Sequence, residues 1–102
     1  MPSLEQLEKL LTLDPNDAFV LYAIAQEHGK FGRHAQAVEF YDRCLAADAD
    51  YCYAYYHKAK SLEHMEKEPD AIKALQAGIV VAKRVGDGKA LSELQGFLAV
   101  IS

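Results

Sequence analysis

The four histidines are the side chains of this chain best suited to hold a metal ion. His28 and His34 lie on either side of an expected turn, and His57 and His64 are seven residues apart, about two turns of a helix. Two histidines that bind one metal from the same helix are roughly four residues apart, which places both rings on one face. Neither spacing fits, so we predict no metal site and interpret these rings as packed or solvated side chains.

Other reactive side chains also lack partners of the required kind. Cys44 and Cys52 do not form a CxxC pair, and we expect both to be reduced thiols. The acidic run of residues 63–70 is explained by a solvated turn without a pair of carboxylates set for acid–base work. The sequence shows no nucleophile beside a base, no glycine-rich phosphate loop and no cofactor fingerprint. It therefore predicts no catalytic residues and no cofactor, and a protein that is not an enzyme.

Composition excludes further classes of partner. Of 102 residues, 51% are hydrophobic and 25% charged, which is typical of a folded globular chain. Eleven basic against fifteen acidic side chains leave a net charge of -4, whereas nucleic-acid binding needs a concentrated basic face. No apolar stretch is long enough to span a membrane, and we expect a cytoplasmic protein without nucleic-acid or membrane partners.

Helical signals follow one another along the whole chain. Ser3 and Gln6 have the spacing of a capping box at the start of a first helix, which ends near residue 13. Asp14 and Pro15 are expected to cap and open the second helix, and Gly32 to end it in the left-handed conformation. Further helices are expected at about 34–47, 51–65, 69–85 and 89–101. No window shows the alternation of a strand, so we predict an all-α fold of about six helices.

The chain also repeats itself with a period of 34 residues. Shifting residues 18–51 onto 52–85 places side chains of similar size together, while few positions are identical. The matched pairs are Phe19 with Tyr53, Tyr22 with Tyr56, Ala25 with Ala59, Ala37 with Ala71, and Tyr41 with Leu75. A period of this length is typical of stacked helical hairpins.

These positions resemble the tetratricopeptide repeat family. Leu21, Ile24-Ala25, Ala37 and Tyr41 stand at the family's characteristic large and small positions, and Asp14-Pro15-Asn16 is similar to its inter-repeat signature. Lys58, Ala49 and Gly78 depart from the pattern, where Leu, Pro and Ala are usual. The resemblance implies a single domain, 1–102, wound as a short right-handed superhelix. Its parts would be a half-repeat helix at 3–13, repeats at 18–51 and 52–85, and a capping helix at 88–101.

In this family the first helix of each repeat lines a concave groove that binds a protein or peptide. The resemblance places eight residues of this chain there: Phe19, Tyr22, Gln26, Lys30, Tyr53, Tyr56, Lys60 and His64. Rings supply contact area and long polar groups fix register, although the rings could instead pack between the repeats. Some members grip a peptide's terminal carboxylate with Lys, Asn and Arg. Tyr22, Gln26 and His57 occupy those places here, so we do not expect that activity.

The last helix suggests an alternative function. Residues 97–101 are apolar on all sides, whereas a terminal helix of a repeat stack should present a polar outer face to water. We therefore also consider a structural assembly module that self-associates, as a homodimer or larger homo-oligomer, through Phe97, Val100 and Ile101.

Overall fold

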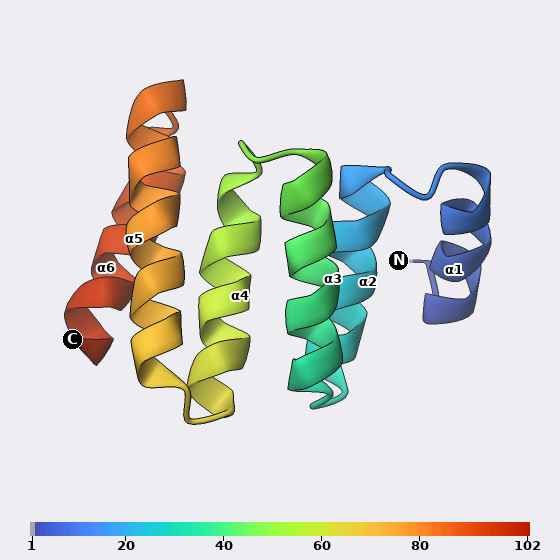
Figure 1. Ribbon diagram of the computed structural model, residues 1–102, viewed down its shortest axis with the longest axis horizontal. Coiled ribbons are helices and arrows are strands. Elements are labelled where there is room, and N and C mark those ends of the chain that lie inside the picture. Colours follow the sequence, from blue (N-terminus) through green and yellow to red (C-terminus); the bar gives the residue numbers. More distant parts are fainter. Residues whose placement is uncertain (1) are drawn as a thin grey trace.

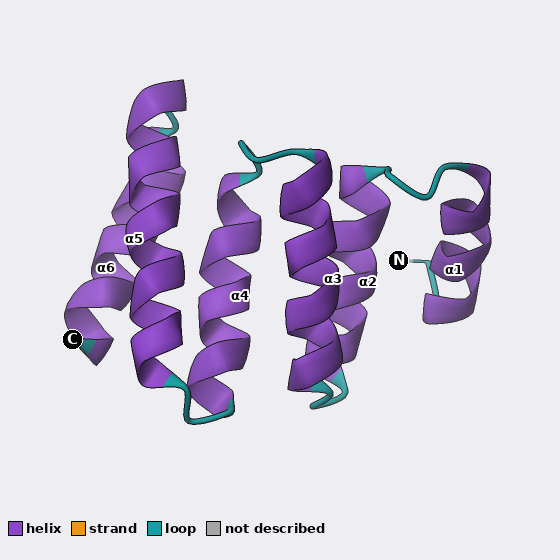
Figure 2. Cartoon of the chain, in the orientation of Figure 1, coloured by secondary structure: helices purple, strands orange, loops and turns teal. Residues whose placement is uncertain are grey.

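The computed structural model describes residues 2–102, which form six α-helices and no strand (Figures 1 and 2). The helices are α1 Leu4–Leu13, α2 Ala18–Lys30, α3 His34–Ala47, α4 Cys52–His64, α5 Glu68–Val85 and α6 Gly88–Ile101. Short turns join them, and they stand side by side along the long axis, with α1 at one end and α6 at the other (Figure 1). The predicted all-α class and six helices are confirmed.

Helix starts follow the local sequence with one exception. The capping box of α1 forms as predicted: Ser3 N–H donates to Gln6 Oε1 at 2.8 Å, and Gln6 N–H donates to Ser3 Oγ at 3.2 Å. The expected start of α2 at Asp14 and Pro15 is wrong. Asp14 instead ends α1, Pro15 lies in the turn, and Asp17 caps α2 by accepting the N–H of Val20 at 3.2 Å.

Turns one period apart have the same conformation. Asp14 Oδ1 accepts the N–H of Asn16 at 3.1 Å, and Asp48 Oδ1 accepts the N–H of Asp50 at 3.0 Å. The backbone agrees as well, since φ and ψ are -147° and 94° at Asp14 and -146° and 96° at Asp48. The period seen in side-chain size is therefore also a period in backbone structure.

The turns inside the two hairpins agree in the same way. Gly32 has φ 76°, as predicted, and Glu66, 34 residues later, has φ 60°. Glu66 is the single residue other than glycine with positive φ in the described part of the chain. A side chain in this left-handed conformation costs about 1 kcal/mol or more, so the second hairpin turn is less relaxed than the first.

Small side chains let neighbouring helices approach closely. Ala25, Ala37, Ala54, Ala59 and Ala71 are all fully buried. Gly78 marks the tightest contact, because a Cβ atom there would lie 2.7 Å from Tyr55 Cβ and 3.0 Å from Leu94 Cδ2. The sequence departs from the family pattern at Gly78 because α4 and α6 both press against this point of α5.

A half-buried lysine has a partner on the neighbouring repeat. Lys58 Nζ lies 2.6 Å from Asp42 Oδ1, and its side chain is 27% exposed. Its aliphatic stem covers apolar surface while the ammonium group stays at the edge, where the charge is paired. Lys58 can therefore replace an apolar residue without leaving an unpaired charge in the core.

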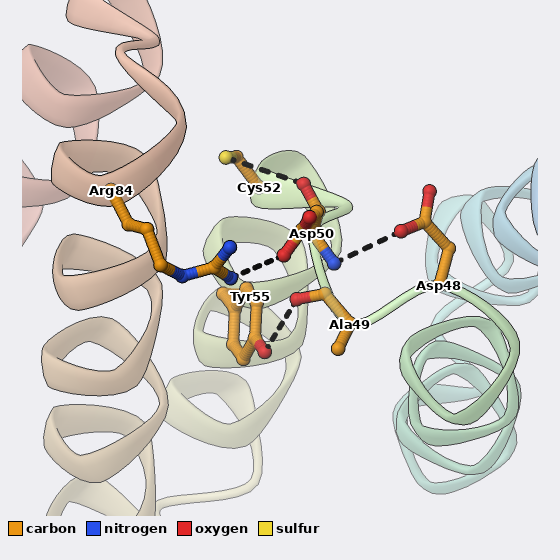
Figure 3. A network of polar contacts seen from close by, with 6 residues as sticks. All are labelled: Asp48, Ala49, Asp50, Cys52, Tyr55 and Arg84. Atoms are coloured by element: carbon orange, nitrogen blue, oxygen red, sulfur yellow. Dashed lines mark hydrogen bonds and ion pairs between the residues drawn. The ribbon is translucent and has the colours of Figure 1, made fainter.

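The turn between the repeats is tied to α5 (Figure 3). Arg84 of α5 donates a hydrogen bond to the carboxylate of Asp50. Tyr55 OH donates to the carbonyl oxygen of Ala49 at 3.0 Å. These contacts fix the turn at Ala49, where the family pattern has proline and its rigid ring.

The contacts between helices define the inner side of the stack. Besides the contacts between consecutive helices, α2 approaches α4 and α4 approaches α6. On the other side of the stack, α1 does not approach α3, and α3 does not approach α5. Alternate helices come close on the inner side of a curved stack. The face shared by α2, α4 and α6, called the concave face below, is therefore the inner one.

No helix among residues 2–102 has the length and apolar character needed to cross a membrane.

Candidate binding groove

A hollow of about 310 Å³ opens on the concave face between α2 and α4. Four of the eight residues predicted for the groove line it: Gln26, Lys30, Lys60 and His64. The remaining lining residues are Glu27, Gly29, His34, Tyr41, His57 and Ser61. The hollow brings together side chains from both repeats.

The other four predicted residues lie nearer the starts of the same helices. Phe19, Tyr22, Tyr53 and Tyr56 precede the polar residues by one to three turns of α2 and α4. We call these four residues the aromatic end of the groove and the hollow its polar end. Phe19 is the most open of the rings, with 66% of its surface exposed.

Tyr22 packs between the repeats. Its ring centroid lies 4.8 Å from that of Tyr51, 5.8 Å from that of His57 and 5.9 Å from that of Tyr41. Burial raises the pKa of Tyr22 far above its ordinary value of 10.0. This ring forms part of the groove floor and holds the two hairpins together.

The centre of the floor is a neutral polar layer. Tyr41 OH donates a hydrogen bond to Gln26 Oε1, which fixes the amide at the surface of the hollow. Burial, and to a lesser extent the charge of Lys60, lowers the pKa of His57 from 6.5 to about 4. His57 is therefore uncharged at neutral pH and acts as a packed ring between Tyr22 and Tyr56.

The aromatic end continues onto α6. The rings of Tyr56 and Phe97 lie 5.6 Å apart, and Lys60 Nζ lies 5.8 Å from the Tyr56 centroid. A hydrogen bond to the Glu93 carboxylate raises the pKa of Tyr53 to about 12. The third helix of the concave face therefore supplies a wall to the groove, which the sequence did not predict.

The polar end contains a histidine pair that the sequence did not indicate. The rings of His34 and His64 are parallel within 2° and their centroids are 4.5 Å apart. His34 Nδ1 lies 3.3 Å from Ser61 Oγ. Burial, with the neighbouring His64, lowers the pKa of His34 below 6.5. The two residues belong to different repeats, so spacing along one helix could not reveal them.

Groups of three or more histidine, cysteine or acidic side chains that could hold a metal ion do not occur within residues 2–102. Both cysteines are buried, and burial raises the pKa of the Cys44 thiol to about 12. The thiolate form that redox chemistry requires is therefore disfavoured.

Comparison with known proteins agrees with this architecture. The sequence profile of the tetratricopeptide repeat matches residues 20–51. The solution structure of a tetratricopeptide repeat domain protein from Salinibacter ruber is 38% identical, with a TM-score of 0.80, covering 87% of this chain and 90% of that one. No curated protein matches the chain.

Two more distant structures share the fold. PcrH, in complex with the chaperone binding region of PopD, is 15% identical with a TM-score of 0.90, covering 96% of this chain and 74% of that one. The TPR2B domain of yeast Sti1, in a complex with pHsp70, is 18% identical with a TM-score of 0.89, covering 94% and 77%.

The chain thus belongs to the tetratricopeptide repeat family. Its repeats match in side-chain size, turn conformation and helix contacts, and its concave face carries a groove.

Proposed function

We propose that this protein is an interaction module that binds a peptide segment of another protein along the concave face. The observation that carries the proposal is the hollow between α2 and α4, which is lined by polar side chains from both repeats and continued by aromatic rings, of which Phe19 is exposed. PcrH and the Sti1 domain, which share the fold, were each solved with a protein or peptide partner.

The two ends of the groove would serve different purposes. At the aromatic end, Phe19, Tyr53 and Tyr56 offer contact area at a small entropy cost, because each ring has only two rotatable bonds. At the polar end, Gln26 is held by Tyr41 and needs no reordering to meet a guest. Groups that are already ordered favour affinity because binding does not have to immobilise them.

Peptides selected by phage display on the folded domain test the proposal. The affinity of each selected peptide is measured by isothermal titration calorimetry for wild type, Phe19→Ser and Phe31→Ser. The control is closely matched, because Phe31 is 63% exposed against 66% for Phe19 and its ring contacts Arg33 outside the hollow.

Loss of one exposed aromatic contact should weaken binding about tenfold for Phe19→Ser and leave it unchanged for Phe31→Ser. Tyr22 is unsuited to this test because its ring also holds the repeats together. Equal affinity of all three proteins for every selected peptide would contradict binding in the groove.

Self-association through Phe97, Val100 and Ile101 is a second candidate. Val100 favours it, since 80% of its surface is exposed, while Phe97 and Ile101 are half-buried on their own chain. Size-exclusion chromatography with light scattering should then show a dimer or larger species that Val100→Glu converts to a monomer. A wild-type monomer at high concentration would end this candidate.

A further inference from the structure

The polar end of the groove is cationic in a protein that is acidic overall. Its lining contains two ammonium groups, Lys30 and Lys60, against one carboxylate, Glu27. The whole chain has a net charge of -4. The hollow is therefore the place on the concave face where a negatively charged group of a guest would be attracted.

The Glu27 carboxylate leaves hydrogen-bond donors of both lysines free for a guest. Glu27 Oε1 lies 3.4 Å from Lys30 Nζ, and the Glu27 side chain is nearly buried, whereas that of Lys30 is 64% exposed. An ammonium group has three donors, so Lys30 can keep Glu27 and still bind a second acceptor. Lys60 has no carboxylate partner within the described residues and lies over the Tyr56 ring.

Further hydrogen-bonding side chains surround the same space. The Ser61 hydroxyl and the imidazole rings of His34 and His64 line the hollow beside the lysines. A carboxylate accepts several hydrogen bonds at once, and bonds from charged donors are about twice as strong as neutral ones. This combination suits a carboxylate better than an amide, which would leave Lys60 without an anionic partner and Lys30 with Glu27 alone.

We infer that the polar end binds the carboxylate of an acidic side chain, Asp or Glu, within the guest peptide, held by Lys30 and Lys60 and assisted by His34, His64 and Ser61. The inference rests on the proposed function and adds the chemistry of the guest. The aromatic end lies one to three helical turns away, so an extended guest would carry an apolar or aromatic residue on one side of the acidic one. The polar end selects for charge and the aromatic end adds contact area.

Two synthetic hexapeptides with blocked termini provide the test. Each contains two tyrosines, and one carries two glutamates where the other carries two glutamines. Because acetyl and amide groups block the ends, side chains supply the only carboxylates. Binding is measured by NMR titration of the isotope-labelled full chain, with chemical shifts mapped onto Lys30, Lys60 and His64. A third peptide, with glutamines and a free C-terminus, tests whether a terminal carboxylate binds as tightly as a glutamate side chain.

The glutamate peptide should bind at least about tenfold more tightly than either glutamine peptide, the blocked one or the one with a free C-terminus. The double variant Lys30→Gln/Lys60→Gln should lower affinity for the glutamate peptide to that of the glutamine peptide. It should leave binding of the glutamine peptide unchanged. The control Lys67→Gln/Lys83→Gln removes the same charge from α5 and the turn before it, outside the hollow, and should retain the preference.

Three results would overturn the inference: equal binding of the two blocked peptides, no binding of the glutamate peptide to wild type, or an equal loss in both double variants. If the glutamine peptide with a free C-terminus bound more strongly than the blocked glutamate peptide, the inference would also be overturned, in favour of a terminal carboxylate. The proposed function is tested separately, by the Phe19→Ser variant. If peptides selected by display still depend on Phe19 while the glutamate preference is absent, the proposed function holds, the inference fails, and the groove binds guests without regard to charge.

Discussion

Replacing Gly78 by alanine should destabilise the protein, although alanine is the better helix former. In the middle of an exposed helix this change stabilises by about 1 kcal/mol. At Gly78 the new methyl group would lie 2.7 Å from Tyr55 Cβ and 3.0 Å from Leu94 Cδ2. Tyr55 Cβ is fixed by its own backbone, so α4 and α5 must move apart, and overpacking of this kind costs about 1–3 kcal/mol. After the gain of about 1 kcal/mol in helix propensity is subtracted, we expect a net loss of up to about 2 kcal/mol.

Gly96→Ala is the matched control for this substitution. Gly96 also lies inside a helix, and a Cβ atom there would meet nothing within 4 Å. This variant should gain about 1 kcal/mol from helix propensity alone. Urea unfolding followed by far-UV circular dichroism measures both changes. If Gly78→Ala were as stable as Gly96→Ala, the close approach of the helices at Gly78 would not exist and the packing argument would be refuted.

Further predictions concern turns and charge. Glu66→Gly should raise the free energy of unfolding by about 0.5 kcal/mol in urea melts, because the strained φ of 60° is relieved while the unfolded chain gains freedom; a loss would contradict this. The pKa of His57 is about 4, below its unfolded value of 6.5, so stability should fall as pH drops through this interval. Between pH 7 and pH 5 the free energy of unfolding should fall by about 1 kcal/mol after allowance for partial exposure. Urea melts of His57→Gln at the two pH values should show a smaller difference than those of wild type; an equal difference would refute the role given to His57. Asp50→Ala should cost at most about 1 kcal/mol, since its pair with Arg84 is half exposed; a cost several times larger would show that the turn depends on it.

The sequence was sufficient for the repeat and its helices. Size at matched positions identified Ala25 and Ala37 as points of close approach, and both are fully buried. Stop and start signals located the turns, apart from the cap of α2, because Asp14 and Asp17 are both suitable capping residues. Local patterns depend on contacts within one helix and its caps, and in this chain they were enough to predict where the helices lie.

The sequence was less informative where two repeats meet. The placement of Phe97 against Tyr56 depends on how α6 packs on α4. That packing follows a longer helix than in the first repeat, since α5 has 18 residues and α3 has 14. The strict period therefore does not give the register of α6. The pairing of His34 with His64 was missed for a similar reason, since it joins the start of one hairpin's second helix to the end of the next hairpin's first.

The link between Asp50 and Arg84 has a consequence for how such a protein could grow. The two residues are 34 apart, one period of the sequence, although Asp50 lies in the turn between the repeats and Arg84 lies in α5. With the same residue type at both positions, two carboxylates or two guanidinium groups would face each other. The opposite charges give attraction here, and a further copy of either unit beside itself would bring like charges together at this contact.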